Sequence, residues 1–505
     1  MTYIFILLKI KLIHGIMIQG EKMDKKLTSN YIYSVIYQTL IVITPFITVP
    51  YLTRVMGVEA LSINDMTGNL TQWFVLFGIM GVNIYGNREI ARVRDNKRDL
   101  SRTFFEIFSM QFISMCLSTI AFFIFINVFK SEYNTYLIVQ GITLLSVSLD
   151  ITWFFYGVED FKKASIRNMA VKILNVALIL ILIKGPQDLM KFIFLNASLG
   201  VFGQLVMWAQ LRHYVHFEKI NLKGILKHVK PNISLFIPQI AISIYSLLDI
   251  SMLGILYEEK EKVVNLYKQA QNFVKMFLFF ITSIGSVMLP RISNIYAKGE
   301  TEAMNRFLNK TFKLALYLAI PMIVGIFGVI QSFVNWFLPL DYYEVGKMMI
   351  LTSPIILFIS LSNVFGTQYL VPIGNYKHYT ISVVSGALVN LTLNYIFIPN
   401  YGAYGAIFGS VMAELMVTVV QWFYVRNKLK VNIHIKELTI IILSSLCMLI
   451  PINLVISNLT NSFISSIIQI VVGGSTYVIL LYVFKAPLFM EILNRFLKRG
   501  VDYEA

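Results

Sequence analysis

The sequence predicts an all-α polytopic membrane protein, and three observations lead to this fold class. Hydrophobic residues make up 57% of the 505 residues and charged residues only 14%, and the mean hydropathy of +0.69 is far above that of a soluble globular chain. Apolar stretches of about 20 residues, long enough to cross ~30 Å of hydrocarbon, recur along the whole chain. Lysines and arginines gather in alternate connections between these stretches.

The apolar stretches predict about 14 transmembrane helices. The first eight cover residues 31–55, 68–85, 104–129, 136–156, 169–183, 192–211, 233–256 and 267–289. The remaining six cover residues 314–337, 348–369, 381–398, 402–424, 438–456 and 463–484.

The distribution of basic residues predicts the orientation. With the N-terminus inside, 34 of the 43 lysines and arginines lie on the inner side, eight on the outer side, and Lys275 inside a span. Basic connections are retained in the cytoplasm. We therefore expect a multi-pass membrane protein with both termini cytoplasmic.

The same pattern predicts a division near residue 220, where the longest inner connection lies. Its apolar positions Leu222, Ile225, Leu226 and Val229 have helical spacing, with lysines between them. This is typical of an amphipathic helix on the inner leaflet. The predicted parts are a cytoplasmic segment at 1–30 (1–22 being an over-extended start or an interfacial segment), six helices at 31–211, the linker at 212–232, six helices at 233–424, two helices at 425–484 and a cytoplasmic tail at 485–505.

Several classes of function are disfavoured. The net charge of +16 is spread over the predicted inner connections, where anionic lipids account for it without nucleic acid. The two cysteines fall inside apolar spans, and His213 and His216 have an HxxH spacing but no third metal ligand nearby. No phosphate-binding GxxxxGK[ST] loop occurs. We predict neither a metal nor another cofactor.

Charged residues inside the predicted spans are costly in lipid and are therefore functional candidates. Arg54 either reaches the outer headgroups or faces an internal cavity. Asp249 and Lys275 form either a structural ion pair or part of a substrate site. Asp150 is predicted to cap a helix or to pair with a nearby lysine, and Glu414 to act in coupling or to hydrogen-bond a neighbouring backbone.

Five stretches resemble, in order, the signature segments of Wzx-type oligosaccharide flippases of the multidrug/oligosaccharidyl-lipid/polysaccharide exporter superfamily. They are VNIYGNREIARVRDNK (82–97), LDITWFFYGVEDFKK (149–163), IPQIAISIYSLLDISMLG (237–254), VMLPRIS (287–293) and YGAYGAIFGSVMAEL (401–415). The resemblance extends over the chain from Met23 onward. One departure is Asn265, which stands where the family often has glycine.

The resemblance implies two pseudo-symmetric six-helix bundles around a central cavity, plus two C-terminal helices. It implies a transporter of the bacterial cytoplasmic membrane and not an enzyme. This transporter would move undecaprenyl-pyrophosphate-linked oligosaccharide repeat units from the inner to the outer leaflet for surface polysaccharide synthesis. The cations Arg54 and Lys275 would bind the pyrophosphate. Polar and aromatic residues that would contact the sugars are Gln38, Tyr51, Asn83, Tyr85, Gln239 and Tyr245.

Energy supply and partners stay open at this stage. Proton or sodium entry at Asp150, Asp249 or Glu414 could drive the cycle, as could the membrane potential. A cation-coupled multidrug antiporter is the main alternative, and a membrane-embedded glycan polymerase or ligase is a further one. We expect a monomer that contacts anionic lipids and the polymerase and glycosyltransferases of its pathway. The sequence does not specify the sugar repeat, and capsule, exopolysaccharide and O-antigen all stay open as its destination.

Overall fold

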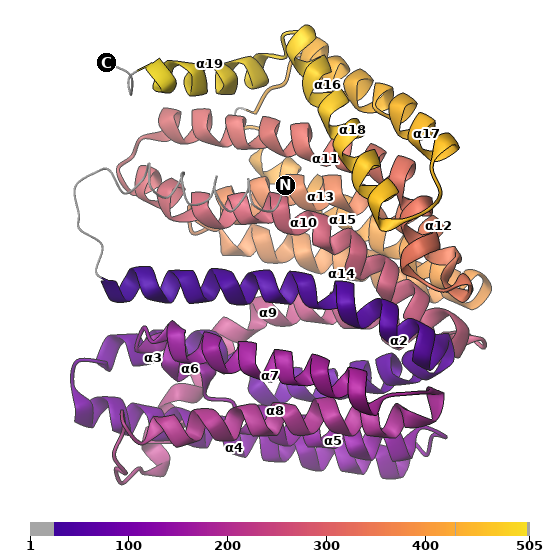
Figure 1. Ribbon diagram of the computed structural model, residues 1–505. Helices are drawn as coiled ribbons and strands as arrows, with labels where there is room; N and C mark the ends of the chain where they lie inside the picture. Colours follow the sequence, from indigo (N-terminus) through magenta and orange to yellow (C-terminus); the bar gives the residue numbers. More distant parts are fainter. Residues whose placement is uncertain (1–24, 430, 502–505) are drawn as a thin grey trace.

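The computed structural model describes residues 25–429 and 431–501, and every regular element in these ranges is a helix (Figure 1). The first half contains α2 (Lys25–Ile79), α3 (Val82–Val93), α4 (Lys97–Val128), α5 (Asn134–Ser148), α6 (Thr152–Gly157), α7 (Phe161–Leu182), η1 (Pro186–Asp188) and α8 (Leu189–Leu211). The second half contains α9 (Leu222–Leu256), α10 (Lys260–Ala297), α11 (Thr301–Phe337), η2 (Leu340–Tyr342), α12 (Glu344–Thr352), α13 (Pro354–Ser362), η3 (Asn363–Leu370), α14 (Tyr376–Tyr401), α15 (Ala403–Val425), α16 (Ile435–Cys447), α17 (Leu449–Asn458), α18 (Phe463–Val483) and α19 (Pro487–Val501).

These helices confirm a polytopic membrane protein. Among the described residues, ten helices are long and apolar enough to cross a membrane, or eleven when the bent pair formed by α12 and α13–η3 is one span. The first of the ten, Ile36–Val93, has 58 residues and a length of roughly 87 Å, which corresponds to two crossings. Two further helices, α9 and α10, contain the predicted seventh and eighth spans, so the helices accommodate 14 crossings.

The first two predicted spans need correction at their boundaries. No connection separates them at 56–67, because α2 continues through this region with a kink at Gly57, whose φ of +74° glycine adopts without strain. Asp65, which lies in the sequence between the two predicted spans, is buried and belongs to this helix. The second span also does not run unbroken to residue 85, since Met80 and Gly81 have positive φ and separate α2 from α3.

The predicted linker forms the first part of a longer helix. α9 begins at Leu222 and continues to Leu256, so residue 232 does not mark a helix end. Ile225 and Val229 pack against the buried cluster around α3, α4 and α6, while Leu222 and Leu226 are exposed. Only one side of the amphipathic segment is thus free to meet lipid.

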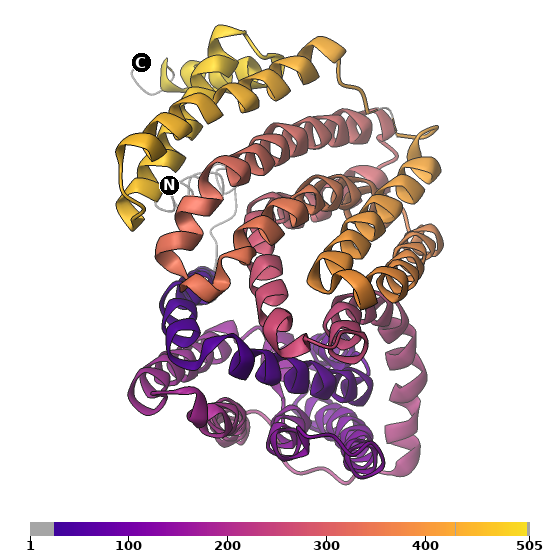
Figure 2. The same cartoon turned by 90° about the vertical axis from the view of Figure 1, so that its right-hand side faces the viewer.

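We call α2–α8 the N-lobe and α9–α15 the C-lobe. Figure 1 shows α3–α8 on one side of α2 and α10–α15 on the other, and α2 packs against both α9 and α10. In Figure 2, α16–α18 form an outermost layer beyond α11, against which they pack. Following the predicted orientation, we call the end of the helices that carries Gly57, Tyr257 and Gly402 the outer end.

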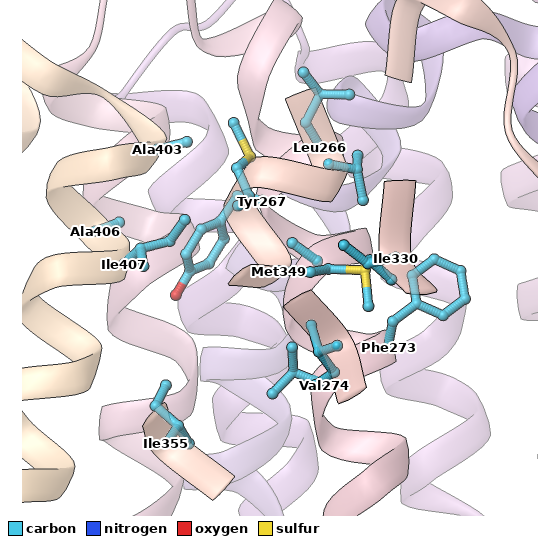
Figure 3. Packing of buried hydrophobic residues seen from close by; sticks show 14 of the residues in the cluster. Leu266, Tyr267, Phe273, Val274, Ile330, Met349, Ile355, Ala403, Ala406 and Ile407 are labelled. Carbon is cyan, nitrogen blue, oxygen red and sulfur yellow. The ribbon is translucent and has the colours of Figure 1, made fainter. Parts of the chain in front are cut away.

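The two lobes have separate cores. In the C-lobe, α10, α11, α12, α13 and α15 enclose a large apolar cluster that includes Phe273, Met349 and Ile407 (Figure 3). In the N-lobe, the inner ends of α3, α4 and α6 enclose an aromatic cluster in which Trp153 stacks on Phe104. A Cβ at Gly86 would come within 2.5 Å of the Trp153 ring. The signature stretches 82–97 and 149–163 therefore pack closely here, and the contact requires glycine.

Candidate functional site

The interface between the lobes is formed mainly by α2 on one side and α9 and α10 on the other. On α10, Lys268, Asn272 and Lys275 recur at helical spacing, which places them on one face. Lys268 reaches Asp65 of α2, so this face is directed toward the N-lobe. Lys275 lies about two turns further inward and is exposed, and it makes no hydrogen bond or ion pair with any described residue.

At the outer end, a network of polar contacts joins the lobes. The Asp65 carboxylate accepts hydrogen bonds from Asn265 Nδ2 at 2.6 Å and from Lys268 Nζ at 2.6 Å. The backbone N–H of Asn265 donates to Ser62 Oγ at 2.9 Å, and Tyr342 donates to Asn265 Oδ1 at 2.7 Å. We call Ser62, Asp65, Asn265, Lys268 and Tyr342 the outer latch. The departure from the family pattern at Asn265 supplies its central amide.

Arg54 is also at this end of the interface. It is exposed, and its Nη1 donates to the Pro50 carbonyl while Nη2 donates to the Trp336 carbonyl in α11, both at 2.9 Å. The guanidinium therefore bridges α2 to the C-terminal end of α11, where a cation is favoured by the helix dipole. No carboxylate neutralises it among the described residues.

A buried carboxylate occupies the C-lobe about two turns from the outer end. Asp249, which is 7% exposed, accepts hydrogen bonds from Asn390 Nδ2 at 2.9 Å, Asn394 Nδ2 at 2.7 Å and Ser410 Oγ at 2.5 Å. Tyr267 donates a further hydrogen bond. Four donors from α10, α14 and α15 thus converge on one carboxylate of α9. The acceptor positions of this carboxylate are therefore occupied by protein donors.

The surroundings of Asp249 rule out the expected structural ion pair with Lys275. Its partners are neutral, and among the described residues no hydrogen bond or ion pair joins it to the exposed Lys275, so the predicted Asp249–Lys275 ion pair does not form. Figure 3 shows Tyr267 between the lobe's apolar cluster and α15, close to Ala406 and Ile407. The Tyr267 ring thus packs among apolar side chains while its hydroxyl donates to Asp249.

Two predicted sugar contacts are engaged elsewhere. The Tyr51 hydroxyl donates to the Ile183 carbonyl at 2.6 Å, which satisfies an end carbonyl of α7. Tyr85 is 3% exposed, and its hydroxyl lies 2.6 Å from His228 Nδ1. Both hydroxyls are thus engaged within the protein in this conformation, and Tyr85 is also buried.

The other predicted site residues are distributed over several places. Gln38 and Asn83 are exposed, whereas the side chains of Gln239 and Tyr245, both in α9, lie outside what the structure describes. Asp150 accepts hydrogen bonds from the backbone N–H and the hydroxyl of Thr152 at 2.9 and 2.6 Å, just before α6, whose N-cap residue is Ile151. Glu414 is half-buried one turn inward of Ser410.

The N-terminal part of α9 makes the inner contact between the linker and the N-lobe. Glu106, fully buried in α4, pairs with Arg102 at 3.0 Å, Lys227 at 2.5 Å and His228 Nε2 at 3.2 Å. A neutral imidazole protonated on Nε2 can donate to Glu106 and accept from Tyr85 at Nδ1. Burial lowers the pKa of His228, and the Lys227 charge adds to this effect against the opposing Glu106 hydrogen bond.

Sequence reasoning missed the neutral members of these networks. Tyr267, Asn390, Asn394 and Ser410 carry no charge and so did not stand out in the spans. A usable signal was present, since Asn390 and Asn394 are one turn apart inside an otherwise apolar stretch. Among the described residues, no group of three or more histidines, cysteines or carboxylates could hold a metal ion.

The helical architecture and the lobe interface define a class, that of multi-pass transporters built from two helical lobes. Comparison with solved structures agrees. The lipid II flippase MurJ in its inward closed conformation matches with a TM-score of 0.72 and 17% identity, covering 90% of this chain and 98% of that one. An inward-facing multidrug resistance MATE family transporter matches with a TM-score of 0.61 and 13% identity, covering 78% and 94%.

Sequence comparison gives the family. The chain belongs to the polysaccharide biosynthesis protein family, whose pattern matches residues 27–296, and the MatE family pattern matches residues 235–396. The "Putative O-antigen transporter" of Escherichia coli K12 is 22% identical over 411 residues, 79% of this chain and 97% of that protein. The lipid II flippase MurJ of Thermosipho africanus is 28% identical over 228 residues, 43% and 44% of the two chains. The predicted resemblance to Wzx-type transporters, as opposed to enzymes, is confirmed.

Proposed function

We propose that this protein flips an undecaprenyl-pyrophosphate-linked oligosaccharide from the inner to the outer leaflet for surface polysaccharide synthesis. The observation that carries the proposal is the pair of cations at the lobe interface, Arg54 and Lys275, neither of which has a carboxylate partner among the described residues. The similarity to an O-antigen transporter over almost its whole length supports the same substrate class.

The chemistry of the cations suits a diphosphate. Two unit charges 4 Å apart attract by about 4 kcal/mol at an effective dielectric constant of 20, against about 1 kcal/mol in water. Arg54 keeps N–H groups beyond those used on the two carbonyls, and a guanidinium fork can bind phosphate oxygens in pairs. Lys275 would add a point charge deeper in the interface. The lipid tail can stay in the bilayer while only the head is desolvated.

The outer latch supplies the barrier that an alternating-access cycle requires. Hydrogen bonds and an ion pair close the outer end in this conformation, so release on that side requires Asp65 to separate from Asn265 and Lys268. We propose that substrate binding at the cations is coupled to this separation.

For energy coupling we favour Asp249 over Asp150 and Glu414. Asp150 is occupied by Thr152, whereas Asp249 is a buried carboxylate inside a span, where an entering proton or sodium ion would supply the counter-charge. Asn394 Oδ1 is also buried and has no hydrogen-bond partner among the described residues. The membrane potential alone could contribute about 4 to 5 kcal/mol to moving ~2 negative charges outward.

The chief alternative is a cation-coupled multidrug antiporter. Such a transporter should present carboxylates to its cationic substrate. Here Asp65 is neutralised by Lys268 and Asp249 is saturated by donors, whereas the accessible charges are cations. We therefore prefer an anionic substrate. We also propose that the protein acts as a monomer with cytoplasmic termini, with anionic lipids along its basic inner connections and the pathway's polymerase and glycosyltransferases as partners.

The proposal is tested by complementing a strain that lacks its own repeat-unit flippase, at matched membrane expression. We expect Lys275→Ala and Arg54→Ala each to lower export of surface polysaccharide about tenfold or more, equivalent to ~1.4 kcal/mol or more, with lipid-linked units accumulating inside. Lys275→Arg and Arg54→Lys should recover part of the export.

Lys347→Ala is the matched control, because Lys347 is exposed and its contacts with Glu344 and Tyr343 lie within its own lobe. It should export normally. Normal export by both Lys275→Ala and Arg54→Ala would contradict an anionic headgroup site at the interface.

A further inference from the structure

The N-lobe contains a second polar cavity that the proposed headgroup site does not use. Its volume is about 190 Å³, and its lining comes from α2, α5 and α8. The polar lining residues are Asn64, Gln140, Thr143, Ser146 and Asn196. Like Asp249 in the C-lobe, Asn64 and Gln140 lie about two turns from the outer ends of their segments.

Three of these side chains are without partners. Gln140, Thr143 and Ser146 lie on one face of α5, and none of them hydrogen-bonds to a residue that the structure describes. This is unlike the hydroxyls of Thr53, Thr67 and many others in the spans, which donate to the carbonyl one turn earlier. The polar atoms of the three α5 side chains face the cavity and are free to bind a molecule that enters it.

The neighbouring residues keep the cavity open. Gly200 of α8 faces Ser146, and a Cβ there would lie 2.7 Å from Ser146 Oγ. Asn196 is held by hydrogen bonds to Asn175 and to the Phe192 carbonyl at 2.9 Å each. The cavity wall is thus fixed by neighbours from α7 and α8, while the α5 groups remain available.

The lining indicates the class of ligand. It has no lysine, arginine, aspartate or glutamate, so it offers nothing to balance a charged group. Amides and hydroxyls both donate and accept, as sugar hydroxyls do. The apolar part of the α8 wall suits the C–H face of a ring. The volume corresponds to the space of about six waters at ~30 Å³ each, which is of the order of one sugar ring.

We infer that this cavity binds one neutral sugar of the transported glycan. The inference rests on the proposed function, of which it names a specificity subsite. It also connects recognition to the outer latch, because Asn64 Nδ2 donates to Asp65 Oδ1 at 3.2 Å. A sugar hydroxyl that competes for the Asn64 amide would weaken the hold on Asp65.

The test measures binding to the purified full-length protein in nanodiscs. The probes are undecaprenyl pyrophosphate, the same lipid bearing one neutral hexose, and the same lipid bearing one N-acetylhexosamine. Wild type should bind at least one sugar-bearing probe about tenfold or more tightly than the bare lipid. The variant Gln140→Leu/Thr143→Val/Ser146→Ala should lose this difference while its affinity for the bare lipid is unchanged.

Controls separate this inference from the proposed function. Thr119→Val is the matched substitution, since the Thr119 hydroxyl donates to its own helix at Met115, and it should keep the difference. Thr143→Val alone serves if the triple variant does not fold. Failure of wild type to bind the bare lipid would overturn the proposed function. Binding of all probes equally by wild type, or full discrimination by the triple variant, would mean that the cavity holds water only and overturn the sugar subsite.

Discussion

The two lobes each have a polar group at the same depth, but with opposite degrees of hydrogen bonding. In the C-lobe, the Asp249 carboxylate is surrounded by four donors. In the N-lobe, the lining of the cavity beside Gln140 and Thr143 has no charged side chain, and its α5 side chains hydrogen-bond to none of the residues that the structure describes. The same helical architecture therefore carries a saturated charged site and an unsaturated neutral one.

The difference follows from the cost of each group in a membrane. An ionised carboxylate withdrawn from water costs several kcal/mol, so it persists only when donors surround it. An unpaired amide or hydroxyl costs less free energy than an unpaired carboxylate, so it can remain without a protein partner and bind a ligand. We conclude that the C-lobe site is suited to a carboxylate and its counter-cation, and that the N-lobe cavity is suited to binding a neutral molecule.

The largest expected effect comes from removing the C-lobe charge. Asp249→Ala would leave the donors of Asn390, Asn394 and Ser410 unpaired, and loss of one member of a buried charged network typically costs 3 to 5 kcal/mol. We expect export to be abolished and the thermal unfolding midpoint in detergent to fall clearly. Gln140→Leu is the matched change in the other lobe and should leave that midpoint almost unchanged. Equal losses of stability would erase the contrast between the lobes.

An intermediate effect is expected at the outer latch, which joins the two lobes. Asn265→Ala removes the hydrogen bonds to Asp65 and Tyr342, so we expect about a tenfold shift toward a conformation open at the outer end. Spin labels at Glu59 and Lys347, in a background without the two cysteines, would report a longer distance between the lobes.

Glu259→Gln is the control for this shift, because Glu259 pairs with Lys262 inside the C-lobe. It should leave the label distances as in wild type. An unaltered distance distribution in Asn265→Ala would show that the latch does not hold the outer end closed.

The smallest expected effect concerns the inner contact and depends on pH. Burial lowers the pKa of His228 below its unpaired value of about 6.5, so the separated state binds the proton more readily. The contact is therefore fully stable above about pH 6.5 and weakens as the pH falls below it. Hydrogen–deuterium exchange over residues 222–232, corrected for intrinsic rates, should be faster at pH 5.5 than at pH 7.5. His228→Gln should remove this pH dependence.

Much of the architecture could be predicted from hydropathy and charge, because lipid restricts which segments can cross it. The helix break at Met80 and Gly81 could not, since it depends on α9: a Cβ on Gly81 would lie 3.2 Å from Phe236 Cβ. Arg54, Asp249 and Lys275 stood out because charge in a span is rare. The role of Asn265 and the α5 cavity required knowledge of which neutral side chains find partners, and that depends on helices distant in sequence.

The continuity of α9 has a mechanical consequence. Its first turns are fixed to the N-lobe through Ile225, Val229 and the Glu106 contacts, while Asp249 near its other end is fixed to the C-lobe. α9 is thus attached to the N-lobe at one end and to the C-lobe at the other. Any rotation of one lobe relative to the other therefore requires α9 to bend between these two attachments. Pro238 lies in that interval and lacks the N–H that stiffens a helix. The flexibility of this short part of α9 would then determine how far the two lobes can rotate relative to each other.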